Sequence, residues 1–333
     1  MGSKSRDDEL AQLRRSIAEG DFAAAEQLLR SVGQGRQRRQ GEPRNDRTGG
    51  DSEPLPCDPC EAASGAETVS RDAADARVED EASPLERECP GQEAKVVTVK
   101  GEASFWRVRC TLGQFSPDDV PVAAEYAAVL RGARQQFDEL TASAELCHAA
   151  NARPEDLLFM DTETCGLSAM AVFLVGLMFF RDGELVFEQY LARDYAEEPA
   201  ILQAFNDRVP EAGVLVTFNG RAFDVPLIAE RSVVHGLAEP WCMPPHLDLL
   251  IEVRRRWRKR LPNCRLQTLE ERFFARRRMD DIPSSQIPDA YHEYVRTSDA
   301  RAIGKVLAHN RRDLLTMSRM VCLLLTGCDP IPG

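Results

Sequence analysis

Apolar residues in the second half of the chain follow two kinds of pattern. Unbroken apolar runs predict buried strands, and apolar residues spaced three and four apart predict helices. The strands are expected over residues 157–161, 172–180, 184–191, 214–218 and 245–249, and the helices over residues 199–209, 225–235 and 302–325. The second and third strands form a hairpin across Arg181-Asp182-Gly183. This order predicts an α/β domain with a mixed sheet and helices on its faces.

A second strand pair and another helix precede this region. Residues 96–99 and 105–110 have strand character on either side of Gly101, and residues 122–146 carry apolar side chains along one helical side. We therefore expect residues 94–153 to lead into a main domain that spans residues 154–328.

The first 93 residues differ in composition. Residues 1–31 are predicted to form a helical hairpin that breaks at Gly20. Such a hairpin is too small to bury its own apolar face, so it is expected to dock on the main domain or on a protein partner. Residues 32–93 are rich in charged residues, Gly, Ser and Pro and almost lack aromatic residues, which predicts a disordered linker.

Composition narrows the class of protein. The 333-residue chain has no apolar run long enough to cross a bilayer and no apolar stretch at its N-terminus, so a cytoplasmic protein without membrane contact is expected. Its ten cysteines are then predicted to be free thiols. Cys57 and Cys60 could form a zinc site with Cys89 and Cys110, but the spacing of these last two is irregular, and unpaired linker thiols are the favoured interpretation.

Acidic residues stand where predicted strands end and where helices begin. Asp161 and Glu163 are one residue apart, so on a strand both side chains point to the same face. The alternative is a strand end whose acids face solvent. Asn219 and Asp224 lie just beyond the next buried strand, where Asp224 is either an N-cap or part of the same acidic group.

His309 and Asp313 are four residues apart on the last predicted helix and therefore share one helical face. Flanking apolar residues turn that face inward, where an unpaired carboxylate is costly. Asp313 therefore either meets a cation at the site or pairs with Arg311, Arg312 or a neighbouring loop.

Four carboxylates in this order point to one chemistry. Asp161, Glu163, Asp224 and Asp313 supply oxygen ligands, which suit two Mg²⁺ or Mn²⁺ ions and not zinc. Two such ions stabilise the attacking and leaving oxygens of a displacement at phosphorus. His309 is then a candidate general base for the attacking water.

A basic segment lies between the acidic ones. Residues 251–278 hold 11 basic and 3 acidic side chains in a chain whose net charge is −12. The cluster predicted to bind nucleic acid consists of Arg254, Arg255, Arg256, Arg258, Lys259 and Arg260. The interleaved aromatic residues Trp257 and Phe273 are expected in the core, although stacking on bases is the alternative.

These segments resemble a known family. The Asp-x-Glu, Asn-x-x-x-Phe-Asp and terminal x-x-x-Asp elements are similar to the DEDD superfamily of 3′–5′ exonucleases, including the proofreading domains of family B DNA polymerases. The YprB-like exonuclease domain is more similar still. The similar segments are residues 159–167, 215–224, 245–250, 261–270, 281–283 and 309–313.

The resemblance implies a ribonuclease H-like fold and a role for each residue. Asp161 would bridge both ions, Glu163 and Asp313 would hold the ion that activates water, and Asp224 would serve the other. His309 would position the nucleophile, with Asn219 and Asp248 in support. The spacing departs from the histidine-type enzymes, which have four residues before the last Asp. Here there are three, which puts His309 where the tyrosine-type enzymes have tyrosine.

The sequence thus predicts a metal-dependent 3′–5′ exonuclease that acts on a 3′ end of DNA or RNA, with a single strand as the expected substrate. Two alternatives remain open. One is a structure-selective endonuclease on the same fold, and the other is a catalytically silent nucleic-acid-binding module.

Overall fold

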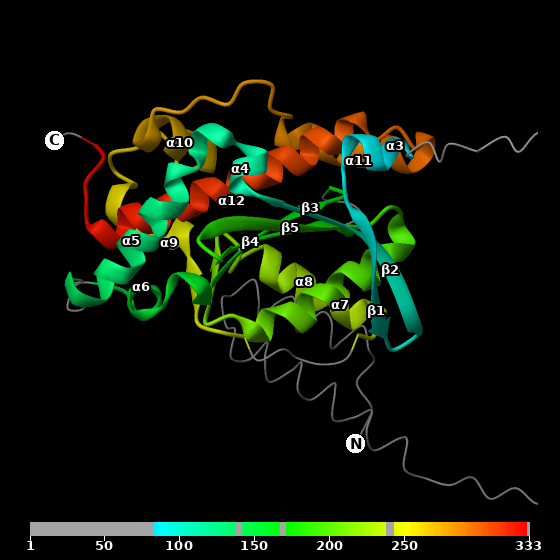
Figure 1. The fold of residues 1–333 in the computed structure, drawn as a ribbon, viewed down its shortest axis with the longest axis horizontal. Coiled ribbons are helices and arrows are strands. Elements are labelled where there is room, and N and C mark those ends of the chain that lie inside the picture. Colours follow the sequence, from blue (N-terminus) through cyan, green and yellow to red (C-terminus); the bar gives the residue numbers. More distant parts are fainter. Residues whose placement is uncertain (1–82, 137–141, 167–170, 238–242, 332–333) are drawn as a thin grey trace, which may run out of the picture.

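A computed structural model describes residues 83–136, 142–166, 171–237 and 243–331 (Figure 1). The predicted N-terminal hairpin and residues 32–82 of the predicted linker, including Cys57 and Cys60, lie outside the described residues. Among the described helices, none combines the length and the apolar composition needed to cross a membrane.

The predicted linker extends too far at its C-terminal end. Helix α3 (Pro84–Glu88) is capped by the hydroxyl of Ser83, which precedes it, and strand β1 already starts at Gln92. Leu85 and Cys89 are buried in the core, and the Cys89 carbonyl accepts a hydrogen bond of 2.9 Å from the Trp106 indole. Burial of these apolar residues, which a composition average over residues 32–93 hides, orders this segment.

Seven strands form one mixed sheet in the order β1-β2-β5-β4-β3-β6-β7. The strands are β1 (Gln92–Thr98), β2 (Gly101–Thr111), β3 (Leu157–Thr164), β4 (Val172–Arg181), β5 (Glu184–Leu191), β6 (Val214–Thr217) and β7 (His246–Asp248). The neighbouring pairs β1–β2, β2–β5, β5–β4 and β4–β3 are antiparallel, whereas β3–β6 and β6–β7 are parallel. The mixed sheet is confirmed, but β2 pairs with β5, so the first strand pair extends this sheet and is not a separate lead-in.

Helices cover the sheet. They are α4 (Leu112–Phe115), α5 (Pro121–Gln136), α6 (Ala144–Asn151), α7 (Glu198–Arg208), α8 (Asp224–His235), α9 (Leu249–Trp257), α10 (Leu266–Phe274), α11 (Ile287–Thr297) and α12 (Arg301–Thr326). One helix was predicted over residues 122–146, but Ser143 caps a new helix there by accepting from the Leu146 amide. Residues 137–141 lie outside the described residues.

Alternation along β3 divides the core into two apolar clusters. Leu158 and Met160 pack into one cluster with residues of α7, α8 and α11. Leu157 and Phe159 belong to the other, with residues of α5, α9 and the second half of α12. Figure 1 shows α5 and α12 on one side of the sheet and α7 and α8 on the other. Asp161 and Glu163 continue the Leu157 and Phe159 face by period-two alternation and therefore point toward α12.

Candidate active site

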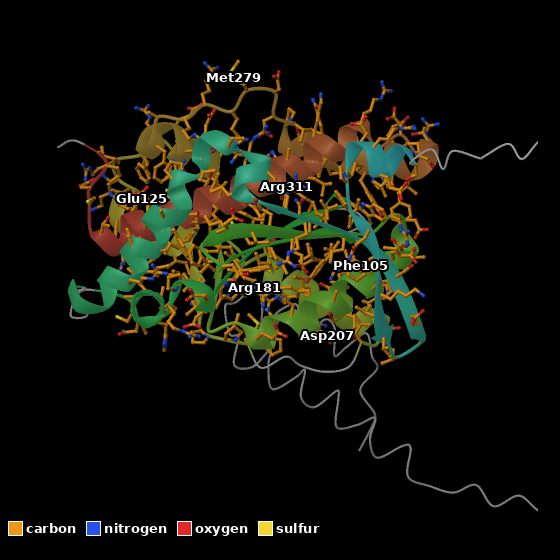
Figure 2. The ribbon with its side chains drawn as sticks, viewed as in Figure 1. Phe105, Glu125, Arg181, Asp207, Met279 and Arg311 are labelled. Atoms are coloured by element: carbon orange, nitrogen blue, oxygen red, sulfur yellow. The ribbon has the colours of Figure 1, made fainter. Side chains whose placement is uncertain are left out.

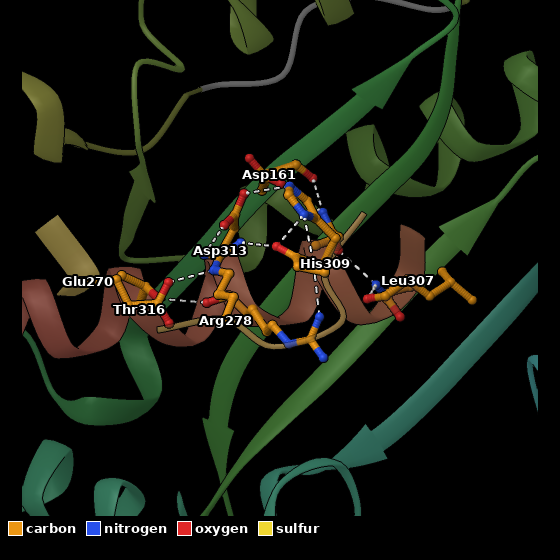
Figure 3. A network of polar contacts seen from close by, with 11 residues as sticks. Asp161, Glu270, Arg278, Leu307, His309, Asp313 and Thr316 are labelled. Carbon is orange, nitrogen blue, oxygen red and sulfur yellow. Dashed lines mark hydrogen bonds and ion pairs between the residues drawn. The ribbon is translucent and has the colours of Figure 1, made fainter. Parts of the chain in front are cut away.

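Strand β3 and helix α12 form the two main walls of the site (Figure 3). The Asp161 carboxylate accepts a 2.9 Å hydrogen bond from the side chain of Asn310 on α12. Glu163 is two residues further along the strand and lies close enough to His309 and Asp313 for their charges to affect its pKa. The structure thus brings both β3 acids to the helix that carries His309 and Asp313, and they do not face open solvent.

Asp224 comes to the site from the loop after β6. It is the first residue of α8 and is buried, and its carboxylate accepts a hydrogen bond from the Thr162 hydroxyl on β3. The alternative reading of Asp224 as an N-cap is wrong, because Phe223 occupies the cap position. Because Thr162 lies between Asp161 and Glu163 on β3, this hydrogen bond holds the Asp224 carboxylate beside both acids.

Asn219 and Asp248 shape the turn that carries Asp224. The buried Asp248 carboxylate accepts hydrogen bonds from the backbone amides of Asn219 at 2.9 Å, Arg221 at 3.1 Å and Leu250 at 3.0 Å. Asn219 has a φ of 70°, a left-handed conformation that asparagine tolerates better than most residues. The Asp248 carboxylate holds the backbone of this turn in place, and its charge contributes to the raised pKa of Asp224.

On α12, Asp313 has a cationic partner from a neighbouring loop. Arg278 donates a hydrogen bond to the Asp313 carboxylate and also binds Glu270 and Asp281. Of the predicted alternatives for Asp313, the neighbouring loop is found, and Arg311 and Arg312 are not its partners. Arg278 is the last residue of the basic segment 251–278, but its side chain is only 7% exposed.

His309 is clamped between two carboxylates. Its Nδ1 lies 3.0 Å from the Asp281 carboxylate, and its Nε2 lies 3.5 Å from Asp313. Asp281 also accepts from Arg312 at 2.9 Å. Sequence reasoning did not assign Asp281 to the site, although the segment 281–283 was part of the family resemblance. Residues 275–283, which we call the strap, thus run across α12 at the site, with exposed Met279 pointing outward (Figure 2).

The carboxylates influence one another's protonation. Burial, followed by the charges of Asp313, Glu163 and Asp224, raises the pKa of Asp161 well above its usual range. Burial and the charges of Asp313 and Asp224 likewise raise the pKa of Glu163 to about 8, although His309 opposes them. Burial raises the pKa of Asp224 to about 6, against the hydrogen bond from Thr162. The four predicted acids therefore form one crowded negative cluster.

Neighbouring charges also set the protonation of His309 and Asp281. Burial lowers the pKa of His309, but the Asp281 hydrogen bond and the charges of Asp313 and Glu163 outweigh it, so the pKa is raised. Burial opposes ionisation of Asp281, yet the contacts with His309 and Arg278 hold its pKa well below the usual range. His309 is therefore a charged imidazolium more readily than a free histidine would be.

The donor set fits a hard divalent cation. Carboxylate oxygens are the ligands that Mg²⁺ and Mn²⁺ prefer, and a cation would relieve the crowding that raises these pKa values. Across the described ranges, however, no three His, Cys, Asp or Glu side chains already surround one point as metal ligands. Arg278 engages Asp313 in this arrangement, so that contact must adjust before Asp313 binds a cation.

The predicted nucleic-acid cluster divides into two groups. Arg254, Arg255, Arg258 and Lys259 are exposed at the end of α9, and Arg255 also pairs with buried Glu252 at 2.8 Å. Arg256 donates to the Leu324 carbonyl, and Arg260 binds Asp329 and the Ile331 carbonyl. Arg256 thus ties α9 to α12, and Arg260 binds residues that follow α12, so neither arginine is free for phosphate.

The aromatic residues of this segment belong to the core, as favoured from sequence. Trp257 is buried, and its ring centroid lies 4.9 Å from that of Phe273. The indole nitrogen donates to Asp329 at 3.2 Å. Stacking of Trp257 on a nucleic-acid base is therefore wrong for this conformation.

Together, the mixed sheet, its helices and the acids on β3, α8 and α12 define a ribonuclease H-like nuclease fold. A sequence profile of the RNase_H superfamily, RNase_H_2, matches residues 158–325, half of the chain. The chain belongs to this superfamily.

Two further comparisons each cover about half of the chain. The uncharacterized protein YprB of Bacillus subtilis strain 168 is 31% identical over 180 residues, which cover 52% of this chain and 43% of that protein. The family B DNA polymerase of the archaeon Pyrobaculum calidifontis is similar over 50% of this chain and 24% of its own, with 17% identity and a TM-score of 0.42. The chain thus matches less than half the length of either protein.

Proposed function

We propose that this protein is a metal-dependent 3′–5′ exonuclease that hydrolyses phosphodiesters of DNA or RNA with two bound Mg²⁺ or Mn²⁺ ions. The observation that carries the proposal is that Asp161, Glu163, Asp224 and Asp313 come from β3, α8 and α12 to lie within range of one another's charges inside a ribonuclease H-like fold. Several buried carboxylates this close together lower the stability of the folded protein unless a cation compensates their charge.

Each acid has a proposed task. Asp161 would serve both ions, Glu163 and Asp313 would hold the one beside the attacking water, and Asp224 would hold the one beside the leaving group. Such ions lower the pKa of bound water and neutralise charge that develops on the phosphate. Asn219 and Asp248 support the turn before Asp224.

The contacts of His309 favour positioning over general-base catalysis. A histidine whose Nδ1 faces Asp281 and whose pKa is raised holds a proton that a base would have to lack. We therefore assign His309 the task of orienting the water or phosphate beside Asp313, with Asp281 fixing the direction of the ring.

Cleavage polarity tests the proposal. With a single-stranded oligonucleotide labelled at its 5′ end, Mg²⁺ or Mn²⁺ should give a ladder that shortens step by step from the 3′ end. Parallel DNA and RNA substrates identify the preferred sugar, and excess EDTA should stop the reaction. A single internal cut would replace this proposal with the endonuclease, and tight binding without cleavage would replace it with the silent module.

The exposed cations of α9 are proposed to contact the phosphate backbone. Reversing Arg254 and Arg258 to Glu should weaken binding of single-stranded nucleic acid about tenfold at low salt. The slope of log affinity against log salt concentration should also become shallower, by the amount expected for the loss of about two phosphate contacts. Reversal of Arg181 to Glu, at the exposed end of β4, is the control for charge reversal elsewhere on the surface. Fluorescence anisotropy over a salt series measures both effects, and equal affinity of the double variant and the control would remove α9 from the binding surface.

Residues 1–31 are proposed to recruit a protein partner, and a cytoplasmic location is proposed for the whole chain. Neither of these two proposals is used in assigning the active site.

A further inference from the structure

One row of residues crosses the sheet beneath α12. Asp161 on β3 is the direct partner of Gly176 on β4, and Gly176 is the direct partner of Gln189 on β5. The two polar members of this row stand on either side of a residue without a side chain. The row therefore has a gap at its centre.

Asn310 of α12 fills this gap. Its side chain is fully buried, and a Cβ atom at Gly176 would lie 1.9 Å from its Oδ1 atom and 2.5 Å from its Cγ atom. No ordinary side chain fits there unless Asn310 moves. A glycine inside an otherwise apolar strand often marks such a close approach.

Hydrogen bonds run through this gap in one direction. Arg311 Nε donates to Gln189 Oε1 at 2.8 Å, and Gln189 Nε2 donates to Asn310 Oδ1 at 2.8 Å. Asn310 Nδ2 then donates to the Asp161 carboxylate at 2.9 Å. Each amide receives on its oxygen and donates from its nitrogen, so a cation at one end and a carboxylate at the other define both amide orientations.

Arg311 supplies the positive end from within the protein. Burial lowers its pKa, and its guanidinium lies 5.6 Å from the centre of the Phe115 ring. In the part of the chain that the structure describes, Arg311 makes no ion pair; its Nε is bonded to neutral Gln189. Aligned hydrogen bonds polarise one another, so the chain directs the positive end of its dipoles at Asp161.

We propose that Arg311, Gln189 and Asn310 form a hydrogen-bond relay that fixes the Asp161 carboxylate for binding a divalent cation, and that Gly176 provides the space for it. The relay rests on the proposed function in one respect, which is that Asp161 is a metal ligand. Asn310, Gln189 and Arg311 are positioning residues, because none of them is itself placed to touch the substrate.

Metal affinity tests the relay without nuclease activity. Asn310→Ala removes the donor to Asp161. Gln189→Glu keeps an acceptor for Arg311 but loses the N–H donors, so Asn310 should turn its amide nitrogen toward the new carboxylate and away from Asp161. Titration of the full-length protein with Mn²⁺ by calorimetry should show binding about 10- to 100-fold weaker in both variants. Gln203→Glu, on α7 at the opposite face, should bind Mn²⁺ as the wild type does.

Kinetics separate positioning from general damage. In both variants kcat should fall while KM for the oligonucleotide stays within about twofold, because no residue of the relay contacts the nucleic acid. A rise in KM with unchanged kcat would overturn the assignment.

A double-variant cycle tests the packing in case a single variant unfolds. Gly176→Ala alone should lower the melting temperature sharply, since its methyl group collides with Asn310. In an Asn310→Ala background the same methyl group enters vacated space, so the added loss should be much smaller. Equal losses in the two backgrounds would overturn the proposed contact.

The two proposals fail in different ways. Wild-type protein that binds no Mn²⁺ removes the metal-dependent function and, with it, the purpose of the relay. If the wild type binds Mn²⁺ and the folded Asn310→Ala and Gln189→Glu variants bind it equally tightly, the relay is refuted and the metal-dependent function stands.

Discussion

Replacing Asp161 with Asn is expected to abolish cleavage while making the metal-free protein more stable. The carboxylate is the acid whose pKa is raised by all three of its acidic neighbours, so its charge is a burden unless a cation is bound. Asparagine keeps the size and an oxygen that accepts from Asn310, but it removes that charge. Loss of about 4 kcal/mol of transition-state stabilisation corresponds to a fall in rate of about 1,000-fold.

Two measurements establish this result. Single-turnover cleavage of a labelled oligonucleotide gives the rate, and thermal unfolding in EDTA at pH 8 gives the stability. Asp313→Asn should lose the same activity but gain less stability, because it weakens the partner of buried Arg278. Asp299→Asn, at an exposed site before α12, is the control. Cleavage within tenfold of wild type in Asp161→Asn, or full activity in Asp224→Ala, would refute the ligand assignment.

The second large effect is a metal-dependent change in stability with pH. The folded protein has a pKa of about 6 at Asp224 and about 8 at Glu163, both above the values of free carboxyl groups. A raised pKa contributes stability that is complete below the unfolded pKa and is lost as the pH rises through the folded pKa. The metal-free protein should therefore lose stability up to about pH 9.

The direction of this effect is clearest between pH 7 and pH 9. Burial lowers the pKa of His246 to about 4, which gives a stability gain with rising pH, but that gain is complete by pH 7. His309 has a raised pKa and acts in the same direction as the carboxylates. In EDTA the melting temperature should fall by on the order of 5 °C over this range.

Bound metal should reverse that loss. Divalent cations bind the ionised carboxylates, so Mg²⁺ or Mn²⁺ at about 100 times its Kd at pH 9 should add about 2.7 kcal/mol. The same metal concentration at pH 7, where protons compete for the carboxylates, should raise the melting temperature less. Differential scanning fluorimetry over a grid of pH and metal concentration measures this. Ca²⁺ and Na⁺ at matched ionic strength separate site binding from screening. A metal effect of equal size at both pH values would show that these carboxylates do not hold the ion.

Much of the fold followed from local pattern. Strands β3 to β6 and helices α7, α8 and α12 lie within a few residues of their predicted bounds, because alternation and helical spacing depend on neighbours in sequence. Helices α9, α10 and α11 were not predicted. They are short, and their stability comes from packing on α12 and its neighbours more than from their own periodicity.

The sequence by itself determined which carboxylates share a face. The period of a strand puts Asp161 and Glu163 on one face, and the period of a helix does the same for His309 and Asp313. Both periods are local and hold before any tertiary contact forms. The Asn-Gly turn before Asp224 was equally local. These short-range constraints, together with the ligand chemistry of carboxylates, were sufficient to suggest the cluster.

Tertiary structure alone decided what surrounds that cluster. Arg278 and Asp281 reach Asp313 and His309 from 35 and 28 residues away, so their contacts depend on the path of the strap across α12. Position 176 requires glycine only because Asn310, from a helix far along the chain, occupies the space above it. Arg256 and Arg260, alike in sequence to exposed Arg254 and Arg258, became structural because the end of α12 and the residues after it pack against them. Local periodicity fixes the direction of a side chain, but its partner depends on how distant backbone segments are packed together.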